Sequence, residues 1–268
     1  EMAEAGAVMP IDELEKYGAL PNGLDDFIAT DLTMYKGKAY GLPWTADTWA
    51  MVYRTDVLQQ AGIDQLPATW DELRKDSEII KEKTGKVGFV FPAANQIWFP
   101  ANYYLWSNGG NFVTEDGKGG YEVGATPEQI AADMNYFKGY IDDGLVPRSV
   151  LSIDEPQDPV LLQGLLDGSM SMAMMPTNTF RQLLGAYEDA HPGEQVPFAS
   201  GVMMAGTSDP LTHLGGRTLV VNSNTKHPEA AWKLVQFLNS QQIFEKYYTN
   251  QYPAQKSLLT PRKYAPQA

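Results

Sequence analysis

The side chains that could do chemistry in this chain are aromatic rings beside polar groups, because the usual catalytic and metal-binding motifs are absent. The three histidines, His191, His213 and His227, stand far apart, and none has a partner at metal-ligand spacing. The chain has no cysteine, which excludes thiolate nucleophiles, disulfides and zinc–thiolate sites. It contains neither a GxSxG elbow nor a Walker-type phosphate loop. We therefore expect no metal and no other cofactor.

Adjacent acidic residues occur, among other places, at 25–26, 142–143 and 154–155. Neighbouring side chains point in different directions, so such pairs rarely converge on one bond. A glycosidase needs two carboxylates at a defined separation. The sequence leaves open a pair formed by acids far apart in the chain, so a glycan-acting hydrolase stays an alternative.

Several aromatic residues stand where one element ends and another begins. Trp44 comes just past an expected strand, and Trp98 precedes an expected helix. Rings at such edges, beside polar groups such as Asp47, suit sugar recognition, because a pyranose stacks its C–H face on a ring while its hydroxyls demand hydrogen bonds. We select Trp44 and Trp98 as ligand contacts. Trp70 and Trp232 lie on amphipathic helices and are expected in the core.

For two other groups of aromatic residues, the spacing does not indicate a ligand contact. Phe99, Tyr103 and Trp106 have the i, i+4, i+7 spacing of one helix face, which favours a place in the core. Trp49 alternates with Met51 in a predicted strand, and the pattern does not decide which way its ring points.

The elements that must position these rings alternate between strands and helices. We expect strands over 39–43 (ending at a proline), 49–53, 87–92, 170–175 and 218–222. Capping boxes at Thr69 and Thr126 predict helices that end at Gly85 and near Gly144. We also expect helices over 1–18 with a break at Pro10, and over 159–167, 180–190, from 228 onward, and 241–248. Ala131, Met134, Phe137 and Ile141 are expected on the apolar face of the helix that follows Thr126. This alternation favours an α/β architecture with largely parallel sheets.

Composition narrows the classes of partner. The net charge is −13, which argues against nucleic acid and against an anionic membrane surface. No apolar run approaches the roughly 20 residues of a membrane helix. The first six residues lack both the basic start and the apolar segment of a signal peptide. They suggest a chain that begins inside a domain.

Short motifs follow one another in order along nearly the whole chain. They are Tyr40-Gly41-Leu42-Pro43-Trp44, residues 49–58, Ala61-Gly62-Ile63, residues 67–73, Asn108-Gly109-Gly110, and residues 168–175, 215–221, 226–232 and 253–257. Each motif alone is weak. Together they closely resemble the extracellular solute-binding proteins of sugar ABC transporters, the maltose-binding-protein-like family 1.

The resemblance implies an α/β fold of the two-lobe periplasmic-binding-protein type (type II), with a hinge and a cleft between the lobes. Lobe 1 would comprise 1–45 and 215–268, and lobe 2 would comprise 46–214. The chain would cross near 43–48 and return near 214–218. The family's first and last elements have no counterparts here, so the first lobe is expected to be incomplete and both chain ends to be missing.

The resemblance also assigns residues to the ligand cleft. The predicted set is Trp44, Asp47, Gln96, Trp98, Phe99, Asn178, Gly216 and Arg217. Two of these have other readings, because Arg217 could form an interlobe ion pair and Asp47 could cap a turn. Relatives often place a glycine and a tryptophan near Asn178, so at this position Asn178 could form a hydrogen bond to the ligand where relatives stack a ring on it.

The function implied is that of a binding module without catalysis. It would capture a sugar or oligosaccharide by hinge closure and deliver it to a membrane ABC permease. The protein is expected to be a monomer outside the cytoplasm, either in a periplasm or lipid-anchored at the cell surface. Besides the hydrolase, a binding protein for a phosphorylated polyol or acidic sugar remains open because of Arg217.

Overall fold

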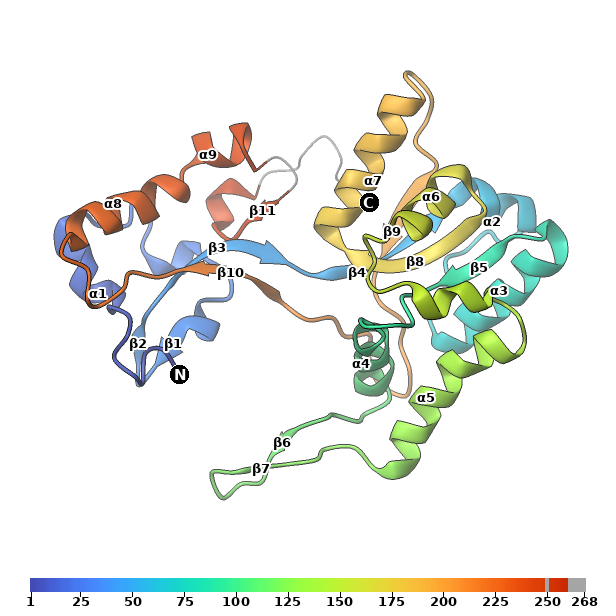
Figure 1. Cartoon of the computed structure of the whole chain (residues 1–268), viewed down its shortest axis with the longest axis horizontal. Coiled ribbons are helices and arrows are strands. Elements are labelled where there is room, and N and C mark those ends of the chain that lie inside the picture. Colours follow the sequence, from blue (N-terminus) through green and yellow to red (C-terminus); the bar gives the residue numbers. More distant parts are fainter. Residues whose placement is uncertain (249–250, 260–268) are drawn as a thin grey trace. The chain divides into compact units, whose positions relative to one another are not determined.

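The computed structural model describes residues 1–248 and 251–259, and the chain divides into two compact units (Figure 1). Unit 1 contains Glu1–Thr48 and the described chain from His213 onward, and unit 2 contains Trp49–Thr212. The lobe limits at 45 and 214 stay predictions. The last part of the predicted lobe 1, residues 260–268, lies outside the described residues, as do residues 249–250.

Unit 1 is built from short strands and three helices. Its strands are β1 (Met34–Tyr35), β2 (Lys38–Ala39), β3 (Leu42–Asp47), β10 (Gly215–Leu219) and β11 (Tyr252–Pro253). Its helices are α1 (Ile11–Leu14), α8 (Pro228–Leu238) and α9 (Gln241–Lys246). Short 3-10 turns lie at Glu15–Tyr17, Leu24–Asp26, Thr30–Thr33 and Lys256–Leu258.

Strand β3 is the centre of unit 1. It pairs antiparallel with β10 on one side and with β11 on the other. The core beside this sheet includes Leu14, Phe27, Leu42, Trp232 and Val235. Trp232 is fully buried, as its place on an amphipathic helix predicts, and its indole N–H donates to the carbonyl oxygen of Gly18 at 2.7 Å.

Three expectations for unit 1 are wrong. Residues 1–6 form turns, and the first helix begins at Ile11, because Pro10 has no N–H and restrains the residue before it. The strand expected to end at Pro43 continues to Asp47. Pro43 is tolerated because it lies opposite Thr218, where the register of β10 shifts, and a bulge needs no donor from it. Strand β10 itself covers 215–219 rather than 218–222.

Unit 2 contains a four-stranded sheet, a hairpin and six helices. The strands are β4 (Trp49–Arg54), β5 (Val87–Val90), β6 (Thr114–Glu115), β7 (Tyr121–Glu122), β8 (Met170–Pro176) and β9 (Phe198–Gly201). The helices are α2 (Thr55–Ala61), α3 (Trp70–Thr84), α4 (Trp98–Ser107), α5 (Pro127–Asp142), α6 (Pro159–Asp167) and α7 (Thr177–Ala190), with a 3-10 turn at Arg148–Ser152.

The sheet of unit 2 has the order β5-β8-β4-β9 and is mixed rather than largely parallel. Strands β5 and β8 are parallel, whereas β4 is antiparallel to both β8 and β9. Three strands thus run in one direction with helices between them in the chain, as parallel strands require. Strand β4 runs opposite to these three strands. In the chain it follows β3 after a single residue, without a helical crossover. The prediction of mostly parallel sheets is therefore wrong.

Local signals placed the helices of unit 2 well. Both capping boxes are formed: the side chain of Thr69 accepts from the Glu72 N–H, and that of Thr126 accepts from the Gln129 N–H. Helix α3 ends at Gly85, whose φ of 71° is left-handed. Helix α7 begins at Thr177, three residues before the expected start at Phe180.

The buried face of α5 differs from the expected one. Met134 is half exposed, whereas Asp133, Phe137 and Tyr140 are buried. The aromatic rings of this helix pack into a cluster around Trp70, and the helix is rotated accordingly. Burial raises the pKa of Asp133 to about 7, so the neutral acid is the form that suits this position.

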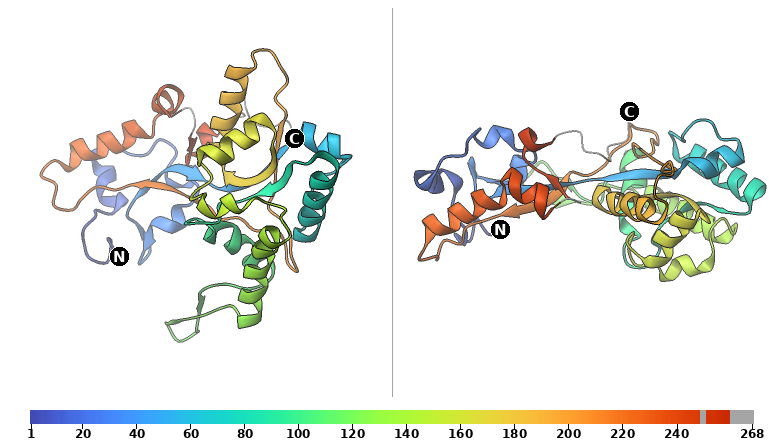
Figure 2. Two further views of the ribbon diagram at one scale, coloured as in Figure 1. Left: turned by 45° about the vertical axis from the view of Figure 1, so that its right-hand side comes forward. Right: turned by 90° about the horizontal axis from the view of Figure 1, so that it is seen from above.

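The hairpin β6–β7 extends away from helices α4 and α5, which it connects (Figure 1 and the left view of Figure 2). At its tip the carboxylate of Asp116 accepts from the backbone N–H groups of Lys118 and Gly120. In the part of the chain that the structure describes, no helix is both long and apolar enough for a membrane span.

Candidate functional site

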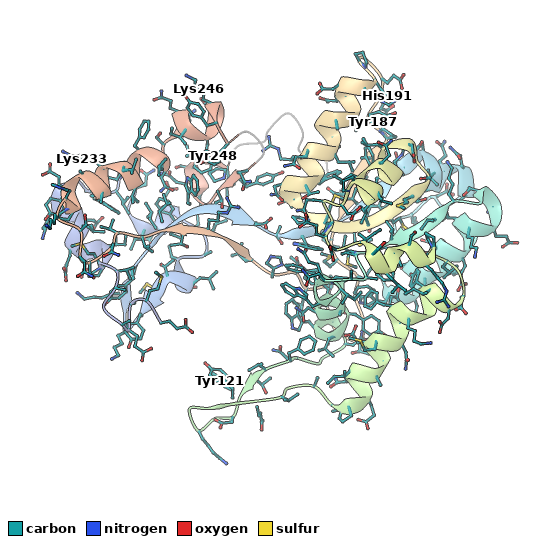
Figure 3. All side chains as sticks on the ribbon, in the orientation of Figure 1. Tyr121, Tyr187, His191, Lys233, Lys246 and Tyr248 are labelled. Carbon is teal, nitrogen blue, oxygen red and sulfur yellow. The ribbon has the colours of Figure 1, made fainter. Side chains whose placement is uncertain are left out.

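Trp44, predicted as a ligand contact in unit 1, is buried on β3. Only 9% of the residue is exposed, and its indole N–H donates to the carbonyl oxygen of Leu238 at 2.9 Å. Tyr248, which follows α9 (Figure 3), meets the indole edge-to-face at a centroid distance of 4.7 Å. Phe244 packs against it at 6.5 Å. The ring therefore holds the helices α8 and α9 to the sheet of unit 1.

Asp47 lies at the end of β3, opposite Gly215 of β10. The nearby imidazole of His213 is half-buried. Burial lowers the pKa of His213, and the negative charge of Asp47 opposes part of that shift. The imidazole is thus neutral at pH 7, with one N–H donor and one acceptor. Thr48 adds a hydrogen bond from its hydroxyl to the carbonyl oxygen of His213 at 2.8 Å.

Gly216 and Arg217 lie on β10, directly after Gly215, which pairs with Asp47. A Cβ atom at position 216 would stand 1.9 Å from the carbonyl oxygen of Thr45, and the φ of Gly216 is 142°. Only glycine allows the two strands to approach this closely. The backbone N–H of Arg217 donates to the hydroxyl of Thr45 at 3.2 Å, and the Arg217 side chain is exposed. This edge of unit 1 therefore offers a guanidinium to solvent.

The predicted residues of unit 2 gather at one end of its sheet. Strands β5 and β8 are parallel, so their carboxyl ends lie at the same edge. Gln96 and Trp98 follow β5, and Asn178 follows β8 within the first turn of α7. In open α/β sheets, ligands bind at the carboxyl ends of strands. Trp49, at the start of the antiparallel strand β4, pairs with Pro176 and so belongs to the same end.

Trp98 is the exposed ring of this group. Half of the residue (50%) is open to solvent, and its indole stacks on Phe99 at a centroid distance of 3.8 Å. Phe99 stacks in turn on Trp49, which is 3% exposed, at 4.2 Å. An exposed indole face of this kind is a surface on which a sugar ring can stack.

Gln96 and Asn178 are held by backbone contacts. The N–H of Gln96 donates to the carbonyl oxygen of Asp154 at 2.9 Å, which fixes the loop before α4. The side-chain oxygen of Asn178 accepts from the N–H of Thr179 at 2.9 Å, so its amide N–H₂ group remains the donor with which it would meet a ligand.

The adjacent acidic pairs are poorly suited to catalysis. Asp26 accepts hydrogen bonds from three other residues of unit 1. Asp142 and Asp143 each form an ion pair with a basic side chain of unit 2. The acids at 154–155 are exposed on a loop. Asp133 has the raised pKa that a general acid needs, but it is 1% exposed and out of reach of a substrate.

Among residues 1–248 and 251–259, no group of three or more acidic or histidine side chains is placed to hold a metal ion. An open groove of about 690 Å³ in unit 2 runs along β9 and is lined by Trp49, Leu66, Val202 and Leu211, among others. Its walls are largely apolar and include none of the predicted ligand residues.

Comparison with known proteins agrees with this arrangement. The family model described as "bacterial extracellular solute-binding protein" matches residues 1–243. The chain belongs to this family. The resemblance deduced from the ordered motifs is thereby confirmed, and membership makes the chain an extracytoplasmic protein.

Individual relatives give the extent of the likeness. A putative binding protein of Brucella abortus (strain 2308) is 32% identical over 218 residues, which cover 79% of this chain and 50% of that protein. A diacetylchitobiose-binding protein of Streptomyces coelicolor is 32% identical over 105 residues, covering 39% of this chain and 24% of that protein. The chain thus spans about half the length of the first of these relatives.

The solved structures show the fold. The GacH receptor of Streptomyces glaucescens, solved unliganded and with acarbose, superposes with a TM-score of 0.73 at 23% identity, covering 96% of this chain and 63% of that one. The predicted α/β fold of the type II periplasmic binding proteins is confirmed. The family and its structural neighbours are substrate-binding proteins rather than a class of enzymes.

Sequence reasoning missed three neighbours of the predicted residues. In unit 1, the hydroxyl of Thr45 accepts from the N–H of Arg217, and His213 lies near Asp47. In unit 2, Trp49 stacks on Phe99. The alternation of β4 left the direction of Trp49 open. No local signal pairs residues 45 and 217, because their contact depends on the register of β3 and β10.

Proposed function

We propose that this protein is the substrate-binding component of an ABC importer and that it captures a sugar or oligosaccharide. The observation that supports this most directly is the exposed indole of Trp98 at the carboxyl ends of β5 and β8. Side-chain groups of Gln96 and Asn178 at the same end can bond hydroxyls. The sugar ligand named for the Streptomyces coelicolor relative fits the same class.

We further propose that the protein acts without catalysis, as a monomer, and delivers its ligand to a membrane permease. Capture would follow the hinge motion of this fold class, in which a ligand binds the closed state better than the open one. The acidic pairs support a role without catalysis, because those at 25–26 and 142–143 take part in hydrogen bonds or ion pairs of the fold. Light scattering of the purified chain tests whether it is a monomer.

The test of the sugar proposal is thermal unfolding against a panel of maltose, lactose, N,N′-diacetylchitobiose and arabino-oligosaccharides. A sugar at 100 times its Kd adds about 2.7 kcal/mol to the free energy of unfolding, which raises the midpoint visibly. Trp98→Ala is the matched control and should shift much less. Protein-dependent hydrolysis of a panel sugar, abolished by one carboxylate substitution, would instead establish the hydrolase.

One observation favours a second ligand class. The exposed guanidinium of Arg217 beside Gly216 suits a phosphate or carboxylate, since arginine binds both with paired hydrogen bonds. Glycerol phosphate and glucuronate therefore join the panel. A shift with these compounds but not with neutral sugars, lost in Arg217→Gln, would assign an anionic ligand instead of a neutral sugar.

A further inference from the structure

Three aromatic rings of unit 2 form a continuous stack from its interior to its surface. Trp49 begins β4, while Trp98 and Phe99 begin α4. The centroids of Trp49 and Phe99 are 4.2 Å apart, those of Phe99 and Trp98 are 3.8 Å apart, and each pair of planes meets at 23°. Exposure rises from 3% at Trp49 to 50% at Trp98. The stack therefore ends in a ring that a ligand can reach.

The geometry uses both faces of the Phe99 ring. Two indoles that lie nearly parallel to Phe99, each with its centroid about 4 Å away, would overlap if they shared one face. They must lie on opposite faces. Each face of Phe99 is thus covered by a ring of unit 2, and neither is open for a sugar to stack on.

The orientation of Trp98 is not the one that a helix alone would give it. Side chains at neighbouring helix positions do not face each other. Here the Trp98 indole is nevertheless folded flat against the next residue, Phe99. Phe99 must therefore stay in place for this orientation of the indole to persist.

The base of the stack is firmly held. Trp49 is buried, pairs with Pro176 in the β4–β8 ladder, and accepts a hydrogen bond at its carbonyl oxygen from the hydroxyl of Thr212 at 3.0 Å. Tyr103 of α4 packs against it at 6.0 Å. A fixed indole at position 49 holds Phe99 from the inner side.

We propose that Phe99 is a positioning residue, which is clamped between Trp49 and Trp98 and holds the Trp98 indole in the plane on which the ligand stacks. This inference rests on the proposed sugar-binding function. It replaces the expectation that Phe99 itself offers a ring face to the ligand. A ring that is already oriented loses less freedom on binding, so the stack improves affinity by reducing the cost of ordering Trp98.

A double-mutant cycle tests the proposal in the full chain, with maltose, lactose and N,N′-diacetylchitobiose as probes in titration calorimetry. Phe99→Leu should weaken binding about 2- to 12-fold, the usual worth of an aromatic pair. Phe99→Tyr keeps the ring and should bind like the parent. In a Trp98→Leu background, Phe99→Leu should cost nothing more, because the residue acts through Trp98. Equal losses in both backgrounds would show direct ligand contact and overturn the proposal.

A second readout needs no ligand. The difference in near-ultraviolet circular dichroism between the parent and Trp98→Leu is the signal of Trp98 in its fixed orientation. Phe99→Leu should shrink this signal, and Phe99→Tyr should preserve it. An unchanged signal in Phe99→Leu overturns the proposal whether or not a sugar binds. If no probe binds the parent, the sugar proposal fails, and the dichroism alone decides whether Phe99 orients Trp98.

Folding is monitored by the thermal midpoint of each variant. If Phe99→Leu does not fold, Phe99→Met replaces it, since methionine fills irregular apolar space without a ring. The outcomes are then judged in the same way, with Phe99→Tyr as the conservative control.

Discussion

Trp44 in unit 1 and Trp98 in unit 2 were predicted for the same task and are built into the protein in opposite ways. Trp44 is 9% exposed, and its N–H is bonded to Leu238 within the same unit. Trp98 is 50% exposed and rests on Phe99. Both follow the same sequence rule, an aromatic residue at the edge of an element. This rule therefore finds rings near a strand end, but it does not separate buried rings that hold elements together from exposed rings that can contact a ligand.

The carboxyl groups of the two units show a similar contrast. Burial opposes the ionisation of Asp26 in unit 1, but hydrogen bonds from Ser257, Asn22 and Gln255 outweigh it and lower its pKa to about 2. In unit 2, burial alone raises the pKa of Asp133 to about 7. Unit 1 thus stabilises the ionised form of its carboxyl group with hydrogen bonds, whereas burial in unit 2 favours the neutral form of Asp133.

The largest expected effect is the loss of stability in Trp44→Ala. Removing a buried tryptophan costs about 3–5 kcal/mol, and the carbonyl of Leu238 also loses its donor. Urea unfolding followed by circular dichroism measures the change. Trp44→Phe keeps a ring without the N–H and should fall between the variant and the parent. If Trp44→Ala lowers the free energy of unfolding by less than about 1 kcal/mol, Trp44 does not hold α8 and α9 to the sheet.

The next effect concerns binding. Trp98→Ala should weaken the affinity for the best sugar of the panel by about 1–3 kcal/mol, because a stacking face is lost. Its free energy of unfolding should fall by only about 0.5–1.5 kcal/mol, the usual worth of the stack on Phe99, which is well below the loss in Trp44→Ala. Calorimetry and urea unfolding give the two numbers. If Trp98→Ala binds the sugar as tightly as the parent, Trp98 does not contact the ligand, and the contrast with Trp44 disappears.

Asp133→Asn should change the pH dependence of unit 2. A carboxyl whose folded pKa is about 7 against an ordinary value of 3.8 destabilises the fold as the pH rises between these values. The variant should therefore be more stable than the parent at pH 8, by about 1–2 kcal/mol, and gain least at pH 4. Thermal melts across this range measure it, with the exposed Asp142→Asn as the control. A constant difference at all pH values would contradict the raised pKa.

The smallest effect is expected at Asp26. Its lowered pKa contributes stability that is present above about pH 4 and is lost as the pH falls toward 2. Asp26→Ala should cost about 1 kcal/mol at pH 7, after allowance for screening by solvent, and less at pH 2. The exposed neighbour Asp25→Ala is the control and should have little effect. Equal behaviour of the two variants would show that the hydrogen bonds to Ser257 and Gln255 are not stabilising.

Much of the fold could be predicted because its signals are local. The capping boxes at Thr69 and Thr126 and the terminator Gly85 lie within a few residues of the helix ends that they define. The motif order identified the family because it spans the chain. The apolar runs of β4 and β8 were likewise found, since strands buried on both faces are nearly continuous apolar runs.

What was missed depends on partners far away in the sequence. The burial of Trp44 needs a carbonyl 194 residues later. The passage of β3 through Pro43 depends on the register shift between β3 and β10. The buried face of α5 was chosen by the aromatic cluster around Trp70, which outweighed the apolar period containing Met134. Register and packing of this kind are decided only when the strands and helices meet.

The close approach of β3 and β10 at Gly216 has a consequence for how this part of the sequence can evolve. A side chain at 216 would collide with the backbone of Thr45 at 1.9 Å, so almost every mutation there is paid for by separating two strands. The next position, Arg217, is exposed and free to vary. Diverging lineages should therefore keep glycine at 216 while they exchange the residue at 217, and the two neighbouring codons should diverge at very different rates.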